Sequence, residues 1–211
     1  MGFWILRNST ATMNTNRQRA TILALLVVLM VATRMHLPAS ITHFGPVPDA
    51  SWAVFFIGGF YLRSWTRWAF PLLMALAVLV DYLVITGQGM NFWAHYCMSV
   101  AYWFLVPAYF AMWLGGVVLR KSYQQANGKA LAVLVASLFG SVVVCHLLSQ
   151  GSFYWLSDSV TDPTFAGWWK NYSDWFLPYL TSTAIYVGLA TIVHVGVLQA
   201  ARLRASASST R

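Results

Sequence analysis

The chain has 211 residues, of which 59% are hydrophobic and only 9% are charged, and its formal net charge is +8. A soluble domain carries about 25% charged residues, so this composition excludes a fully water-exposed globule. It predicts an all-α integral membrane protein of one compact domain in the lipid bilayer. The basic residues lie between apolar segments, where they set membrane orientation. We therefore expect no nucleic-acid partner, despite the positive charge.

A transmembrane helix crosses about 30 Å of hydrocarbon and needs about 20 apolar residues. Five segments of the chain approach or exceed this length: 19–35, 66–86, 98–119, 128–149 and 175–200. A sixth apolar segment, 51–62, is too short to span alone at about 1.5 Å per residue. We expect it to lie against other helices, where irregular backbone beside it is shielded from lipid. The sequence thus predicts six transmembrane segments, the second one short.

The distribution of charge predicts the orientation of these segments. With a cytoplasmic N-terminus, only two basic residues, Arg34 and Lys170, fall on the outer side. The other eleven fall on the cytoplasmic side: Arg7, Arg17, Arg19, Arg63, Arg67, Arg120, Lys121, Lys129, Arg202, Arg204 and Arg211. The acidic residues, all aspartates, fall toward the outer face. Because Lys and Arg accumulate on the cytoplasmic side, we predict that both termini are inside.

The two ends of the chain differ in character from its middle. Residues 1–18 are predicted to be a cytoplasmic tail, 19–204 the membrane domain, and 205–211 a disordered tail. Met13 competes with Met1 as the true start. The apolar stretch 21–32 also resembles the core of a signal peptide, but no clear A-x-A cleavage site follows it.

The stretch 90–105, MNFWAHYCMSVAYWFL, places a thiol, an imidazole and a phenol at the outer start of a predicted helix. These belong to Cys97, His95 and Tyr102. A helix N-terminus favours the thiolate form of cysteine, and a thiolate can ligate a soft metal. Cys145 is interpreted as a packing residue, although a disulfide with Cys97 is an alternative.

Asp81 lies inside a predicted membrane span, about one turn from its outer end. An ionisable side chain there is costly and is by default a candidate functional residue. The alternative is a structural role, in which Asp81 pairs with Arg34 or caps a neighbouring helix.

Two predicted outer loops carry candidate ligand-binding residues. The first, 36–51, contains His36, His43 and three prolines, which stiffen it. The second, 150–174, is long and aromatic, and loops of this length are usually functional or disordered. Its aromatic side chains suit either an interfacial belt or a lid over a large flat ligand; they include Phe153, Tyr154 and Trp155.

The predicted cytoplasmic half carries small residues that let helices approach closely. Ala20 and Ala24 form an AxxxA step in the first helix, a candidate partner-binding surface. Glycines offer further close-approach surfaces at positions 58, 59, 115 and 116. The chain has no Walker A motif, so it does not hydrolyse ATP through a P-loop.

These features together resemble the S-components of energy-coupling-factor (ECF) vitamin transporters, which are small six-helix proteins of the bacterial inner membrane. The closest resemblance is to the solitary cobalamin S-components of the BtuM family. It rests on the size, the AxxxA step, and a cysteine at the outer start of the fourth helix with a tyrosine five positions on. In that family the cysteine ligates cobalt and supports decyanation of cyanocobalamin, with an acidic residue on the third helix nearby.

The resemblance implies that Cys97 is the cobalt ligand, with Asp81 and Tyr102 as its catalytic partners. It also implies an outward cavity for cobalamin, an S-component-like bundle, and cysteine-mediated enzyme activity toward the bound vitamin. An ECF-type transmembrane and ATPase module would dock on Ala20 and Ala24. His36, His43, His95 and the aromatic side chains of the second loop would contact the ligand.

Two alternatives remain open from the sequence. The chain could be an S-component-like carrier for another vitamin or small molecule, with Cys97 incidental. It could instead be a membrane redox subunit, with His146 and His194 as a pair of haem ligands.

Overall fold

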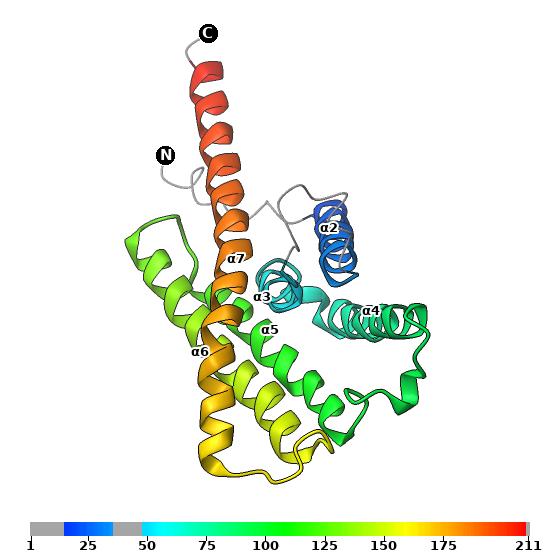
Figure 1. The fold of residues 1–211 in the computed structure, drawn as a ribbon. Coiled ribbons are helices and arrows are strands. Elements are labelled where there is room, and N and C mark those ends of the chain that lie inside the picture. The colour runs from blue at the N-terminus through cyan, green and yellow to red at the C-terminus, as the bar shows by residue number, and fades with distance from the viewer. Residues whose placement is uncertain (1–14, 36–47, 210–211) are drawn as a thin grey trace.

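The computed structural model describes residues 15–35 and 48–209, which form helices and connecting turns, with no strand among them (Figure 1). The α-helices are α2 (Asn16–Arg34), α3 (Ser51–Tyr61), α4 (Thr66–Gly87), α5 (Leu105–Ser122), α6 (Gly128–Leu156) and α7 (Phe165–Ser209). The 3₁₀ turns are η1 (Arg63–Trp65), η2 (Phe92–Ala94) and η3 (Val100–Phe104). The prediction of an all-helical protein is confirmed for this part of the chain.

Five described helical segments are long and apolar enough to cross a membrane, and α3 is a shorter apolar helix of 11 residues. This agrees with the predicted set of five long segments and one short one. The first helix begins at Asn16, three residues before the predicted span. Thr15 and Gln18 form a capping box there, in which each side chain satisfies a backbone N–H of the first turn.

The short helix α3 lies at the centre of the bundle, and all of its residues from Ser51 to Phe60 are buried. Its packing against α5 depends on glycines on both helices. A Cβ atom at Gly59 would overlap the backbone carbonyl of Trp113, and one at Gly116 would overlap the carbonyl of Phe56. The predicted close approach at the four glycines is therefore confirmed, and it explains how a helix too short to span is shielded from lipid.

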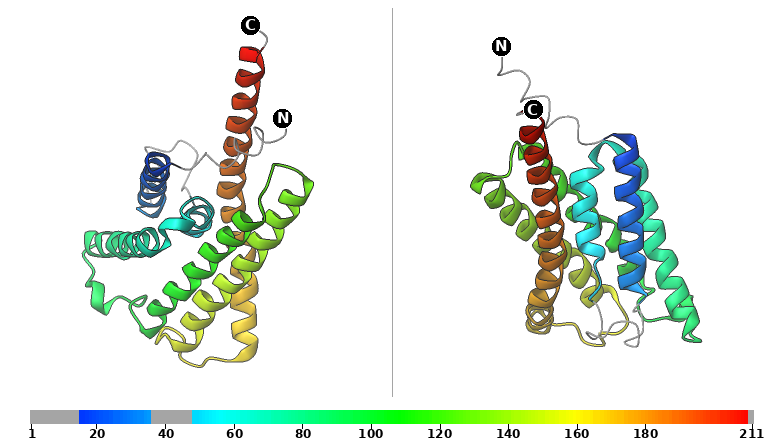
Figure 2. Two further views of the ribbon diagram at one scale, coloured as in Figure 1. Left: turned by 180° about the vertical axis from the view of Figure 1, so that it is seen from behind. Right: turned by 90° about the horizontal axis from the view of Figure 1, so that it is seen from above.

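The helices alternate in direction, so the described chain has two distinct ends (Figure 2, right). The acidic end carries all the aspartates, residues 48–50, which precede α3, and the loops that follow α4 and α6. The basic end carries the start of α2, the α3–α4 and α5–α6 connections, and the last turns of α7. The two basic residues at the acidic end are both ion-paired: Arg34 with Asp49 and Asp81, and Lys170 with Asp174.

Several predicted boundaries are wrong, most clearly those of the last two helices. Helix α6 continues to Leu156 and α7 starts at Phe165, so the predicted loop 150–174 shrinks to residues 157–164. Its aromatic residues extend the helices because they pack against one another, as Trp169 and Tyr172 do at 6.1 Å. At the other end α7 continues to Ser209, so residues 205–209 of the predicted disordered tail are helical. Alanine there favours the helix, and Ser206 and Ser208 donate hydrogen bonds back to it.

Candidate functional site

A cavity of about 690 Å³ opens at the acidic end and receives side chains from all six described α-helices and from the turn before η3. This volume lies in the range of about 300–1,000 Å³ that is typical of small-molecule sites. Arg34, Asp49 and Asp81 bring charged groups to its wall, and Cys97 brings a thiol. The helices thus converge on one site, although the residues that form it are far apart in sequence.

Arg34 organises the polar part of the cavity. Its Nε and Nη2 donate to the two oxygens of Asp81 at 2.7 and 2.8 Å, a bidentate pair. Its Nη1 lies within hydrogen-bond distance of Asp49, Ser51 and Tyr109, at 3.2, 2.9 and 3.2 Å. The Arg34 side chain is only 12% exposed. The structure therefore shows the structural role considered for Asp81, in which it pairs with Arg34.

Tyr102 joins the same network from η3. Its hydroxyl donates to Asp81 Oδ2 at 2.7 Å, so both oxygens of that carboxylate already accept hydrogen bonds. Asp81 therefore has little capacity to accept a further hydrogen bond. Its geometry suits a positioning role, in which it holds the Tyr102 phenol at the cavity wall.

Cys97 lies in a turn that precedes η3, not in the first turn of a helix, where Ser99 is the N-cap. Its backbone N–H donates to His95 Nδ1 at 3.3 Å, which fixes the imidazole beside it. Burial raises the pKa of the Cys97 thiol, although a hydrogen bond with Tyr96 acts in the opposite direction. The expectation of a thiolate favoured by the helix dipole is therefore wrong for the ligand-free protein.

Aromatic side chains form the apolar wall of the cavity. Trp52 of α3 stacks on Tyr179 of α7 with ring centroids 4.7 Å apart, and Trp175 and Phe153 line the same space. Asn171 also lines it, and its Oδ1 is buried without a hydrogen-bond partner among the described residues. The cavity therefore offers flat apolar surfaces to a ligand.

The structure brings together five of the predicted site residues at the cavity: Asp81, His95, Cys97, Tyr102 and Phe153. Two others do not line it. Tyr154 is buried, and its hydroxyl accepts from the backbone of Thr164, while Trp155 is 44% exposed. His36 and His43 lie outside the described residues, and the exposed Ala20 and Ala24 are at the basic end of α2.

Several cavity residues were missed by reasoning from the sequence, chiefly Asp49, Trp52, Tyr109 and Tyr179. Arg34 gave the clearest available signal, because it is one of only two basic residues predicted on the outer side. A charge that breaks the orientation pattern needs a partner, and this points to the aspartates nearby.

Among the described residues, no group of three or more His, Cys, Asp or Glu side chains could hold a metal ion. A single thiol can still serve a metal that brings its own macrocyclic ligands and needs only an axial one. Neither cysteine forms a disulfide, and Cys145 is fully buried in the core, as predicted for a packing residue.

The two histidines considered for haem lie far apart. His146, on α6, lies beside Tyr172 of α7, with Nε2 2.9 Å from the carbonyl oxygen of Tyr172. His194 lies on α7 too, 22 residues after Tyr172. At about 1.5 Å per residue this separation is about 33 Å, too far for both imidazoles to reach one iron.

Comparisons with known proteins do not extend this description: no family model matches the chain, and no curated protein is found to be similar to it.

Proposed function

We propose that this protein is a cobalamin-binding component of a membrane transporter, and that the acidic-end cavity is its vitamin site. The observation that carries the proposal is the placement of one free thiol, Cys97, in an aromatic-walled cavity to which all six described α-helices contribute. The flat corrin ring suits the aromatic wall formed by Trp52, Tyr179 and Trp175.

In the proposed chemistry the Cys97 sulfur becomes an axial ligand of Co(III) and displaces cyanide. The Co–S bond forms as the Co–CN bond breaks, the thiol proton leaves with cyanide as HCN, and no electron is transferred. A soft anionic sulfur competes well for this position. Tyr102, held by Asp81, would hydrogen-bond at the reacting side of the cavity. The decyanation would make the protein an enzyme as well as a carrier.

For the membrane arrangement we propose six segments in the bacterial inner membrane, with the acidic end outside and both termini in the cytoplasm. The segregation of charge supports this, because both exceptional basic residues are paired with aspartates. The site then faces the compartment from which a vitamin is taken up.

Uptake against a gradient would need an ATP-hydrolysing partner. We propose that an ECF-type module docks on the face of α2 that contains Ala20 and Ala24. Both alanines are exposed, and Leu25 and Val28 beside them are each 64% exposed. Small residues at this spacing permit a partner helix to approach closely.

The test is the visible spectrum of the full chain purified from cells supplied with cyanocobalamin. The wild-type protein should carry a corrin spectrum whose bands differ from those of free cyanocobalamin because sulfur has replaced cyanide. Cys97→Ala should remove the difference, and Cys145→Ala, which changes the buried cysteine, should retain it. A cobalt-free protein with no affinity for cobalamin would refute the proposal. In that case the second candidate, a carrier for another small molecule at the same cavity, would be favoured.

A further inference from the structure

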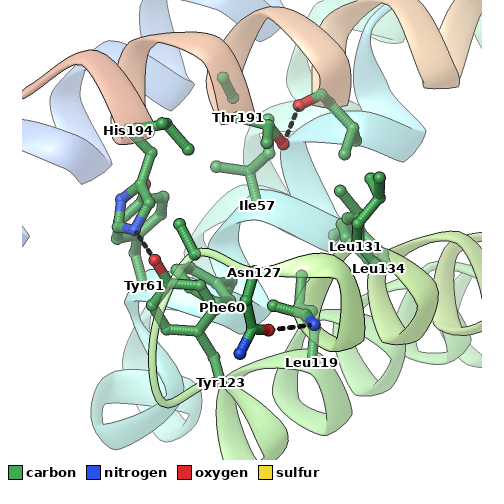
Figure 3. A pocket seen from close by; sticks show the side chains of 16 residues that line it. Ile57, Phe60, Tyr61, Leu119, Tyr123, Asn127, Leu131, Leu134, Thr191 and His194 are labelled. Atoms are coloured by element: carbon green, nitrogen blue, oxygen red, sulfur yellow. Dashed lines mark hydrogen bonds between the residues drawn. The ribbon is translucent and has the colours of Figure 1, made fainter. Parts of the chain in front are cut away.

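A second cavity, of about 180 Å³, lies at the basic end, remote from the proposed vitamin site. Figure 3 shows it between α3, α6 and α7, with the end of α5 closing one side. Helices α6 and α7 lie side by side near the α6–α7 loop and diverge toward the other end (Figure 1). Its walls are mainly apolar, with Ile57, Leu131, Leu134 and Val187 among them. We refer to it as the inner groove.

One end of the inner groove is polar. His194 lies between two phenols, with Nδ1 2.7 Å from the Tyr61 hydroxyl and Nε2 3.1 Å from the Tyr123 hydroxyl. Figure 3 shows the His194 imidazole at this end, with Tyr61 and Tyr123 beside it. The groove thus has the form of an apolar slot that ends in hydroxyl and imidazole groups.

Positive charge gathers at the same end. The Arg120 guanidinium lies 5.3 Å from the centroid of the Phe60 ring, so it is held beside the groove. Arg202 lies about two turns beyond His194 on α7, toward the same end of the molecule. All five aspartates belong to the acidic end, so no carboxylate neutralises these arginines within the described residues.

We propose that the inner groove binds one anionic phospholipid, with an acyl chain against its apolar walls and the phosphate between Arg120 and Arg202. An acyl chain matches the walls, and the uncompensated arginines match a phosphate. Basic pockets between membrane helices commonly bind anionic headgroups in this way. The proposal is independent of the vitamin site and uses none of its residues.

The test is native mass spectrometry of the delipidated full chain, titrated with phosphatidylglycerol or phosphatidylcholine carrying identical acyl chains. We expect one phosphatidylglycerol to bind about 25-fold more tightly than phosphatidylcholine, because each of two arginines near an anionic headgroup contributes about fivefold. Arg120→Gln should reduce the preference to about fivefold. Arg67→Gln is the matched control, since Arg67 also lies over an aromatic ring, that of Trp68, but not at the groove. It should leave the preference unchanged.

A second pair of variants tests the acyl site itself. Ala190→Trp would fill the groove and should abolish the single tight lipid, whereas Ala184→Trp, on an exposed part of α7, should not. If Ala190→Trp does not fold, as judged by circular dichroism, the Arg120 and Arg67 pair decides alone. Equal binding of the two lipids would overturn the proposal, as would an equal effect of both arginine variants. A dimer that replaces the lipid peak would also overturn it, in favour of a second copy.

Discussion

Arg34 is the residue on which the candidate site depends most. Among the described residues it alone forms hydrogen bonds with Asp49, Asp81 and Tyr109 together, and Asp81 and Tyr109 lie 47 and 75 residues away from it in the sequence. Removing one partner of a buried ion pair is costly because the other charge stays buried. Exposed pairs contribute little, since water already solvates both groups. Breaking the largely buried Arg34–Asp81 pair should therefore cost much more stability than breaking the exposed Lys170–Asp174 pair.

Asp81→Asn should destabilise the protein by about 3 kcal/mol, because it leaves Arg34 in a largely buried position with a weakened partner. Asp174→Asn is the matched control. It breaks the exposed pair with Lys170 and should cost about 0.5 kcal/mol or less. Thermal unfolding in detergent measures both variants. Equal melting temperatures for the two would contradict the assigned importance of the Arg34 network.

The raised pKa of Cys97 predicts how the proposed ligation depends on pH. The free protein holds the thiol proton and sulfur binds cobalt as thiolate, so displacement of neutral water from aquacobalamin releases one proton, whereas cyanide carries that proton away as HCN. Affinity for aquacobalamin should therefore rise about tenfold per pH unit below the thiol pKa and level off above it. Titrations between pH 6 and pH 9 measure the slope. In Cys97→Ser the slope should vanish, and a pH-independent wild type would count against the sulfur ligand.

At the scale of elements, the pairing of α3 with α5 determines the core. Glycines on both helices bring the two backbones into direct contact, and Trp113 of α5 is completely buried against Gly58 and Gly59. Such packing replaces hydrophobic side-chain volume by close backbone approach, which is the usual means of helix association in membranes.

Gly59→Ala should destabilise the protein by about 3 kcal/mol, because the added methyl group overlaps backbone atoms of Trp113 that no rotamer change can move. Gly140→Ala, in the interior of α6, is the control. A Cβ there meets nothing within 4 Å, and the alanine should raise stability by up to about 1 kcal/mol. Unfolding by heat or denaturant distinguishes them, and a neutral Gly59→Ala would disprove the direct backbone contact.

At the scale of the whole molecule, charge divides the protein into two ends, each with its own cavity. The acidic end holds the proposed vitamin site, and the basic end holds the inner groove. Helices α3, α5, α6 and α7 line both cavities, but no lining residue is common to the two. Ligands at the two ends can therefore be tested separately.

The proposed orientation predicts the result of reporter fusions. A reporter fused after Arg211 should be active on the cytoplasmic side, because an even number of spans separates the two termini. A reporter inserted in the loop 157–164, which joins the fifth and sixth segments, should be active on the outer side. Replacing Arg63 and Arg67 by Gln should weaken this preference, whereas Lys170→Gln should not. An external signal from the C-terminal fusion would overturn the count of six.

Much of the fold followed from the sequence because membrane spans depend on length and hydropathy, which are local properties. The glycine contacts and the pairing of Asp81 with Arg34 also had local signals. The end of α6 and the start of α7 had no such local signal, because their aromatic and polar residues are also typical of loops. Helix formation there depends on packing between aromatic rings. The cavity residues Trp52 and Tyr179 could not be found at all, since only the tertiary fold brings them together.

The shortness of α3 has an electrical consequence. Its 11 residues measure about 17 Å along the axis, well below the hydrocarbon thickness of about 30 Å. The cavity reaches the start of this helix, so water entering it would carry the outer potential to Arg34 and leave the voltage to fall over the thinner remainder. A charged ligand would then reach the site from outside without crossing the field, and the full value of about 2.3 kcal/mol per charge for each 100 mV would apply to its passage through the remainder. Inward release of such a ligand, and not loading of the site, would then depend on the membrane potential of the cell.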